Sequence, residues 1–186
     1  MGRAVVITGP SGVGKGTLIR SLRERMPNVQ LSVSATTRRP RPGETQGVDY
    51  HFLSAEQFDR HVADGDFVEH ADYAGARYGT LRCELQTRMA SGSAVVLEIE
   101  LQGARQVRET MPEATQVFVA PPSLDALRAR LVGRGTDDPQ QIDRRLRSAE
   151  GELAAQDEFA KVVVNDRLEH AVDELVAVVR EATATL

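Results

Sequence analysis

The feature that most constrains this chain is a glycine-rich loop directly after its first apolar run. Residues Ala4 to Ile7 form a short, β-branched run that predicts a buried strand. The loop Gly9-Pro10-Ser11-Gly12-Val13-Gly14-Lys15 follows, and apolar residues then recur at helical spacing from Leu18 to Met26. A strand, a Gly-x4-Gly-Lys loop and a helix in this order predict a phosphate cradle, with Lys15 reaching the β and γ phosphates of a nucleotide. The alternative is a structural turn that happens to hold a lysine.

The loop departs from the usual motif at one position. Ser or Thr normally follows the lysine and supplies a hydroxyl to Mg²⁺, whereas here Gly16 follows it and Thr17 comes next. A hydroxyl–metal bond at position 16 is therefore impossible, and we expect Mg²⁺ to be held by phosphate oxygens and water. Thr17 is predicted to bind phosphate. The loop alone is compatible with ATPases, GTPases and many kinases.

The rest of the chain alternates between predicted strands and helices. Further buried strands are predicted at Ala94 to Ile99, Gln116 to Ala120 and Lys161 to Val164. Helices separate them, with Ser123 as one N-cap and Asp138-Pro139 as the start of another helix. This alternation predicts an α/β fold, a three-layer parallel sheet flanked by helices, with ligands at the carboxyl ends of the strands.

Residues 32–80 interrupt this alternation with frequent proline and glycine. We interpret them as a small mixed α+β substrate-binding insert, in which Ser54 to Gln57 form a capping box before a short helix. The predicted organisation is a single domain, residues 1–186. Its core covers about 1–31, 81–125 and 150–186, the insert about 32–80, and a helical lid about 126–149.

Composition excludes several classes of partner. The 186 residues are 41% hydrophobic and carry a net charge of −4, so no basic field predicts a nucleic-acid or membrane partner. No apolar run approaches the roughly 20 residues that span a bilayer, and no signal peptide is recognised, so we expect a cytoplasmic location. The single cysteine, Cys83, is interpreted as an ordinary helix residue. The four histidines are scattered and predict no structural metal.

Arginines and a tyrosine gather in an irregular stretch of the insert. The run from Thr36 to Glu44 holds Arg38, Arg39 and Arg41 between prolines, and Tyr50 follows. Planar guanidinium forks suit bidentate capture of phosphate, although a solvated basic loop is an equal alternative on these residues alone. The whole run from Thr36 to Leu53 resembles the signature of guanylate kinases. The resemblance extends over essentially the whole chain, through Glu69-His70-Ala71, Tyr78-Gly79-Thr80, Gln102-Gly103-Ala104, Gly133-Arg134-Gly135 and Asn165-Asp166.

This resemblance implies an activity and a set of site residues. The implied activity is transfer of the γ-phosphoryl group of ATP to GMP, and also to dGMP, with Mg²⁺ as cofactor. No obligate protein partner is implied, and the oligomeric state is left open. The implied acceptor ligands are Arg38, Arg41, Tyr50 and Tyr78 for the phosphate of GMP, and Ser34, Glu69, Thr80 and Glu100 for the base.

The chemistry of guanine supports the base contacts. Guanine presents N1–H and an amine as donors and O6 as an acceptor, so a reader needs a carboxylate and a hydroxyl or another donor. Glu69 with Ser34 and Thr80 is such a set. Adenine would place a lone pair against the carboxylate, and misfits of that kind can discriminate by a factor on the order of 10⁴.

Two acidic residues lie at the end of the predicted strand 94–99. Glu98 and Glu100 alternate with Leu97 and Ile99, so both can face the ligand crevice. Glu98 resembles the acid that lies near the acceptor phosphate and the metal-bound waters, so Mg²⁺ is expected near Thr17 and Glu98 without an assigned direct protein ligand. Members of the family usually have Asp at position 100, and the longer Glu100 puts the contact with the base in question.

The predicted lid is rich in arginine. Exposed arginine helices with i,i+4 pairs are the simpler interpretation for any single arginine there. The resemblance implies that Arg134 and Arg145 contact the phosphates of ATP and that Asn165 belongs to the adenine pocket.

Phosphoryl transfer requires positioning and charge stabilisation, here from Lys15, Arg38, Arg134 and Arg145, and we predict no phosphoenzyme. Two alternatives stay open at this point. One is a kinase of the same fold for another small molecule, and the other is a related binding module without catalysis.

Overall fold

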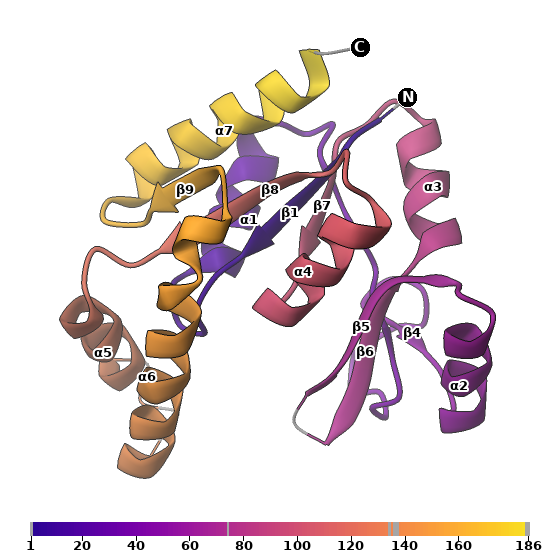
Figure 1. Ribbon diagram of the computed structural model, residues 1–186, viewed down its shortest axis with the longest axis horizontal. Coiled ribbons are helices and arrows are strands. Elements are labelled where there is room, and N and C mark those ends of the chain that lie inside the picture. Colours follow the sequence, from indigo (N-terminus) through magenta and orange to yellow (C-terminus); the bar gives the residue numbers. More distant parts are fainter. Residues whose placement is uncertain (1, 74, 134, 136–137, 185–186) are drawn as a thin grey trace.

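A five-stranded parallel sheet forms the centre of the computed structural model, which describes residues 2–73, 75–133, 135 and 138–184. The strand order is β2-β7-β1-β8-β9, and all four pairings are parallel (Figure 1). The strands are β1 (Ala4–Thr8), β2 (Gln30–Leu31), β7 (Val95–Glu98), β8 (Thr115–Ala120) and β9 (Lys161–Val164). The loop after β1 therefore emerges at the carboxyl edge in the middle of the sheet, where ligands of such folds gather.

Helices cover both faces of this sheet. The helices α1 (Lys15–Arg25) and α7 (Leu168–Ala184) pack on the face to which Val5 and Ile7 point. On the opposite face α3 (Arg82–Ala90) and α4 (Leu101–Thr110) pack against Val6 and Leu97. Side chains alternate along β1, so one strand supplies both cores, and its five residues are all buried.

The segment between β2 and α3 folds as a second, four-stranded sheet with one helix. Its order is β4-β3-β6-β5, with β3 parallel to β4 and antiparallel to β6. The elements are β3 (Ala35–Thr36), β4 (His51–Phe52), α2 (Ala55–Ala63), β5 (Phe67–Tyr73) and β6 (Ala76–Leu81). Phe58 of α2 is fully buried against Phe67 and Leu81, which gives this sheet a small core of its own.

Two helices project from the opposite side of the same edge. They are α5 (Leu124–Gly133) and α6 (Pro139–Ala154), and the short helix η1 (Gln156–Glu158) leads from α6 to β9. Leu127, Leu131, Ile142 and Leu146 pack between α5 and α6. Figure 1 shows this helical pair and the second sheet extending in the same direction on either side of the central sheet.

The structure confirms the predicted α/β fold with a parallel sheet between helices. It also confirms the predicted helix starts, because Ser54 and Asp138 each close a capping box and the Ser123 hydroxyl accepts a hydrogen bond from the backbone of Ala126. Cys83 is an exposed residue of α3, as expected. In the described residues no helix is long and apolar enough to cross a bilayer.

The predicted element order lacked β2 and α3. Strand β2 has only two residues, too few for a period-2 pattern, and it exists because it pairs with Val95 and Val96 of β7. Helix α3 buries only Leu85 and Met89 in nine residues, so its apolar stripe is narrow. Both elements depend on partners that are distant in the sequence.

Side chains of α4 satisfy the outer edge of β5. Gln106 accepts a hydrogen bond from the His70 backbone N–H at 2.9 Å and donates one to the His70 carbonyl at 2.8 Å. The Thr110 hydroxyl donates to the Val68 carbonyl at 2.7 Å. The second sheet is thereby fixed to the core through a strand edge that would otherwise present unpaired backbone groups.

We predict that Gln106→Leu destabilises the protein by about 1–3 kcal/mol, because two partly buried backbone groups of His70 lose their partners. Thermal unfolding should report a fall of about 2–4 °C per kcal/mol for a chain of this size. The control is Gln86→Leu on the exposed side of α3. Equal melting temperatures for the two variants would contradict the prediction.

Candidate active site

The glycine loop keeps its shape because its glycines are tightly packed and adopt positive φ angles. Gly9 has φ 138°, and a Cβ atom there would lie 2.2 Å from the Val119 carbonyl oxygen of β8. Gly14 has φ 102°, and its Cβ would lie 2.7 Å from the Asn165 side chain. A larger residue at either position would collide with its neighbour and strain the backbone. The sequence pattern thus reflects real steric limits.

Lys15 lies inside the loop that precedes it. Its side chain is buried, and Nζ donates hydrogen bonds to the carbonyl of Gly9 and, at 3.3 Å, to that of Pro10. These two contacts hold the ammonium group at the mouth of the loop. A phosphate oxygen there would meet a cation that is already partly desolvated, where charge interactions are stronger than in water.

The back of the loop is tied to two other segments through one carbonyl group. The Val13 carbonyl accepts hydrogen bonds from Asn165 Nδ2 at 2.8 Å and from Arg130 Nη1 at 3.1 Å. Arg130 Nη2 also donates to the Asn165 carbonyl at 2.6 Å. Arg130 therefore packs against the loop, whereas the sequence favoured an exposed helix residue at such a position. No local pattern in the sequence marks this role, because α5 meets the loop only in the folded chain, where Leu131 packs against Gly12.

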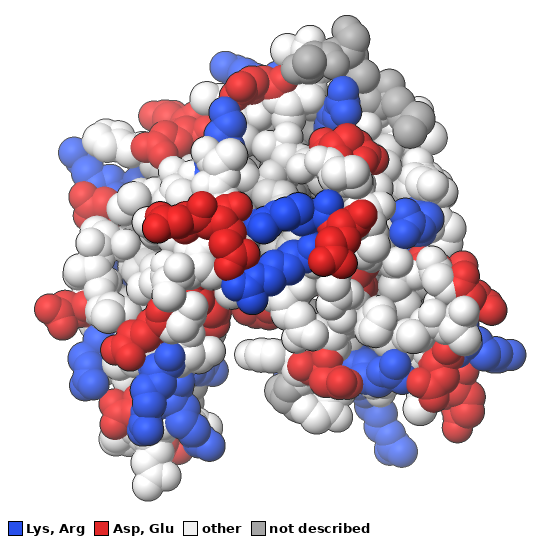
Figure 2. Space-filling view, in the orientation of Figure 1, with Lys and Arg blue, Asp and Glu red and all other residues white. Residues whose placement is uncertain are grey.

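A cleft of about 750 Å³ runs from this loop to the second sheet. Figure 2 shows the notch between the two arms of the molecule on one face. Most of the predicted site residues line the cleft, namely Pro10, Ser11, Gly12, Gly14, Lys15, Gly16, Thr17, Ser34, Arg38, Arg41, Tyr50, Glu69, Tyr78, Glu98 and Glu100. The fold therefore brings the predicted donor and acceptor residues to one cavity.

Other predicted residues lie outside the lining of this cleft. Gly9 and Val13 contribute packing and a carbonyl to the loop, and the buried Asn165 uses its side-chain amide to hold Val13. Arg145 belongs to α6, and Arg134 falls outside the described residues. The adenine role of Asn165 and the phosphate roles of the two arginines stay predictions.

A buried carboxylate lies at the acceptor end of the cleft. Glu69 of β5 pairs with Thr80 of β6 across the sheet, and the Thr80 hydroxyl donates to Glu69 Oε1 at 2.7 Å. Thr80 is fully buried and does not line the cleft, so its hydroxyl supports Glu69. Gly103 of α4 leaves room for the other oxygen, because a Cβ there would lie 2.7 Å from Glu69 Oε2. Burial raises the pKa of Glu69, an effect that the hydrogen bonds from Thr80 partly offset.

The guanidinium and phenol groups of the insert gather on the same side. Arg38 makes a bidentate ion pair with Glu44, at 2.8 and 3.0 Å, and lies 5.2 Å from the centre of the Tyr50 ring. The Tyr50 and Tyr78 rings meet edge to face, with centroids 6.1 Å apart. Arg38, Arg41, Tyr50 and Tyr78 thus form one polar wall of the cleft.

Glu98 is the last residue of β7, as the strand pattern predicted, whereas Glu100 lies beyond the strand as the N-cap residue of α4. Burial raises the pKa of Glu98, Lys15 counters this rise, and the charge of Glu100 adds to it. The negative charge of Glu98 near Lys15 favours the binding of a metal ion in this part of the cleft. Among the residues that the structure covers, no group of three or more His, Cys, Asp or Glu side chains is arranged to hold a metal ion directly.

Sequence reasoning assigned no role to seven residues of the lining. They are Arg20, Glu44, Ala71, Tyr73, Gly79, Ile99 and Gly103. Glu44, Ala71, Gly79 and Gly103 stood inside the motifs that carry the resemblance, so position in a motif was an available signal. Arg20 and Tyr73 carried no such signal, because only the folded chain brings them to the cleft.

Comparison with known proteins agrees with this geometry. The family model described as guanylate kinase matches residues 1–182. The chain belongs to the guanylate kinase family. It is 58% identical to a guanylate kinase of Frankia casuarinae over 92% of this chain and 94% of that protein, and 55% identical to one of Streptomyces coelicolor over 94% and 89%.

Solved structures lead to the same family. The crystal structure of guanylate kinase from Anaplasma phagocytophilum has a TM-score of 0.74 at 32% identity and covers 98% of this chain and 86% of that one. A gluconokinase from Sinorhizobium meliloti has a TM-score of 0.52 at 17% identity, which shows a shared fold alone. These comparisons confirm the resemblance to guanylate kinases that the sequence motifs indicated.

The buried carboxyl group of Glu69 predicts a pH-dependent stability cost. Its folded pKa lies above the unfolded value, near 4.5, so its contribution to stability is complete below that pH and is lost as the pH rises through the folded pKa. Glu69→Gln removes the charge and keeps an acceptor for Thr80. We expect the melting temperature of the variant to lie a few degrees above that of the parent at pH 8. The shift corresponds to about 2–4 °C for each kcal/mol gained in the free energy of unfolding. The difference should shrink toward pH 4, where the carboxyl group of the parent is neutral.

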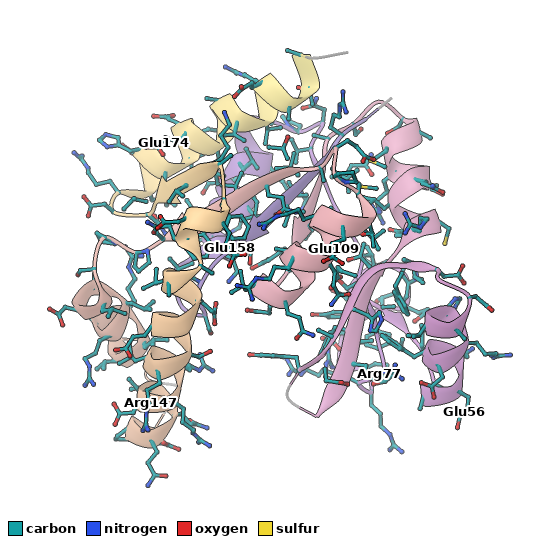
Figure 3. The ribbon with its side chains drawn as sticks, viewed as in Figure 1. Glu56, Arg77, Glu109, Arg147, Glu158 and Glu174 are labelled. Carbon is teal, nitrogen blue, oxygen red and sulfur yellow. The ribbon has the colours of Figure 1, made fainter. Side chains whose placement is uncertain are left out.

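The control for this measurement is Glu174→Gln, on the exposed side of α7 (Figure 3). Its melting temperature should follow that of the parent at every pH. A difference between Glu69→Gln and the parent that does not change with pH would refute an ionisation effect.

Proposed function

We propose that this chain transfers the γ-phosphoryl group of ATP to GMP, and to dGMP, and releases ADP and GDP or dGDP. It is an ATP:GMP phosphotransferase of purine nucleotide metabolism. The observation that carries the proposal is the single cleft that connects Lys15 of the glycine loop with the buried carboxylate of Glu69 and the wall around Arg38. A donor site and a guanine-compatible acceptor site face each other across it.

The donor nucleotide binds along the glycine loop. Backbone N–H groups of the glycine loop and the N-terminus of α1 bind its phosphates, although Pro10 has no N–H and that of Val13 already donates to the Pro10 carbonyl. Lys15 exchanges its carbonyl contacts for the β and γ phosphates. Arg134 and Arg145 of the proposed lid add positive charge that offsets the charge of these phosphates. Asn165 lies beside the adenine end of this site.

Mg²⁺ fits this site as an ion held through phosphates and water. The cleft offers Glu98 close to Lys15, while Gly16 withholds the hydroxyl that the usual loop provides. Thr17 and Glu98 are the residues of this chain that would hold its water shell. The ion, when bound, neutralises charge on the β and γ phosphates.

The acceptor base is recognised at Glu69. The N1–H and amine of guanine donate to its carboxylate, the Thr80 hydroxyl fixes that carboxylate, and Ser34 with Glu100 supplies further polar contacts. Adenine offers no donor at N1 and would leave the buried carboxyl group without a partner. The phosphate of GMP lies between Arg38, Arg41, Tyr50 and Tyr78.

The transfer is a direct in-line displacement. A phosphate oxygen of GMP attacks the γ-phosphorus of ATP, the bond to the β–γ bridging oxygen breaks, and ADP leaves with that oxygen. Lys15, Arg38, Arg134 and Arg145 stabilise the developing charge, so the protein forms no covalent intermediate. Closure of the insert, about residues 32–80, and the lid, about 126–149, excludes water and limits ATP hydrolysis.

The reaction requires no protein partner, nucleic acid or membrane, and we assign it to the cytoplasm. The negative net charge of −4 supports the absence of a nucleic-acid or membrane-surface partner.

An acceptor panel tests the proposed function. With Mg²⁺ and ATP we expect GMP and dGMP to stimulate ADP formation, while AMP, CMP and UMP do not, because Glu69 pairs with guanine alone among these bases. Lys15→Met should lower kcat at least about 100-fold, as expected for loss of a charge contact in the transition state.

Lys161→Met is the matched control, because this chain has only two lysines and Lys161 pairs with Glu181 away from the cleft. Stimulation by another monophosphate would overturn the base assignment and keep the kinase chemistry. Folded protein without acceptor-dependent turnover would favour the binding module.

Glu100→Asp tests the unusual acid at this position. If Glu100 contacts the base, shortening it removes one hydrogen bond, and the KM for GMP should rise about 2–10-fold with little change in kcat. Glu109→Asp, exposed on the same helix α4, is the control (Figure 3). An unchanged or lower KM for GMP would show that Glu100 makes no productive contact.

A further inference from the structure

The loop that connects Arg38 to Glu44 closes on itself through one carboxylate. The segment has no regular secondary structure, and Pro40 and Pro42 remove two of its backbone donors. Glu44 accepts hydrogen bonds from Arg38 Nη1 at 3.0 Å, from Arg38 Nη2 at 2.8 Å and from the Arg41 backbone N–H at 2.7 Å. The Glu44 backbone N–H returns to the Arg41 carbonyl at 3.1 Å. Both ends and the middle of the loop thus meet at Glu44.

Other groups hold the same guanidinium in place. Arg38 Nη1 also donates to the Arg39 carbonyl at 2.8 Å, and the Arg38 backbone N–H donates to the Thr36 hydroxyl at 3.1 Å. The guanidinium lies over the Tyr50 ring and 5.9 Å from the centre of the Phe52 ring. Its planar fork is therefore fixed in direction before any phosphate arrives.

The ion pair is stable at neutral pH. Hydrogen bonding to Glu44 raises the pKa of Arg38, and Arg38 with the Arg41 backbone amide lowers the pKa of Glu44. The two side chains are 18% and 19% exposed, so solvent screens the pair only in part. Glu44 therefore carries its charge whenever the cleft binds a phosphate.

Glu44 also sets the charge of the phosphate site. Arg38 and Arg41 contribute two positive charges, and Glu44 reduces the sum to one, although the ligand is an anion. A carboxylate that lines an anion site is costly unless it has a compensating task. The contacts above point to that task, because the carboxylate directs the fork of Arg38 and the backbone that bears Arg41.

We propose that Glu44 is a positioning residue of the acceptor site, which holds Arg38 and Arg41 in the geometry that binds the phosphate of GMP. This inference rests on the proposed function, because it takes that phosphate to lie against these arginines. Glu44 itself does not touch the reacting atoms. The alternative is that Glu44 competes with the phosphate for Arg38, and the contacts between Arg38 and Glu44 are the same in both cases.

Substitution separates the two roles by the sign of its effect. Glu44→Gln removes the charge and places an amide N–H₂ against one arm of the guanidinium. If Glu44 positions the arginines, the KM for GMP rises at least about tenfold, as for loss of a charge-assisted hydrogen bond, while the KM for ATP stays within about twofold. If Glu44 competes, the KM for GMP falls, because the site gains a net positive charge. A lower or unchanged KM for GMP overturns the proposal.

Further variants exclude a general structural effect. Glu44→Asp keeps the charge and shortens the reach, so its KM for GMP should fall between those of the parent and Glu44→Gln. Arg38→Lys removes the fork, and adding Glu44→Gln to it should raise the KM for GMP no more than about twofold further, because both changes break one unit. Independent, multiplying effects of the two substitutions would overturn the proposal.

The control is Glu56→Gln, the same change on an exposed residue of helix α2, which packs on the second sheet. Glu56 lies at the end of the insert that is far from the notch (Figure 3). It should leave both KM values unchanged. Absence of GMP-dependent turnover in the parent and in Glu56→Gln would refute the proposed function itself. A different result would refute only the role of Glu44. In that result the parent and Glu56→Gln turn over normally, and Glu44→Gln has the melting temperature of the parent and an unaltered KM for GMP.

Discussion

The carbonyl group of Val13 is the contact on which the active site depends. Asn165 and Arg130 both donate to it, so the turn of the glycine loop is fixed from β9 and from α5 at once. This support adds to the packing of the glycines, because glycine is conformationally permissive and the residues around it have to select one backbone shape. When Asn165 and Arg130 fix Val13, Lys15 can donate to the carbonyls of Gly9 and Pro10, and its ammonium group lies at the mouth of the cleft.

The same logic governs the acceptor side, where each ligand group is held by a second residue. Thr80 and Gly103 fix the carboxylate of Glu69, and Glu44 directs the guanidinium of Arg38. A site built in this way lowers the stability of the folded protein when Glu69 is charged, because burial raises the pKa of Glu69 and disfavours its ionised form. Under the proposed function this cost is compatible with activity, since the guanine base would add its donors to the hydrogen bond that Thr80 gives to Glu69.

The two sides belong to different parts of the fold, which meet at a small number of segments. The second sheet meets the core through α4, where Gln106 and Thr110 satisfy the edge of β5, and through α3, which follows β6 directly. The lid helices pack on each other and meet the loop at Arg130 and Leu131. The helical pair and the second sheet each have a hydrophobic core of their own, so each can keep its internal packing during the proposed closure over two nucleotides.

The sequence by itself determined the parallel sheet, the phosphate loop and the helix starts, which follow from local rules: β-branched runs, glycines at positions of positive φ, and capping residues such as Ser54 and Asp138. The acceptor side of the cleft lining was predicted from the resemblance of the motifs to the guanylate kinase family. Only the tertiary structure decided that Asn165 and Arg130 support the loop, that Thr80 faces Glu69 and not the cleft, and that Glu44 closes onto Arg38. The reason is physical, because a side chain's partner depends on which distant backbone lies beside it, and no periodicity records that.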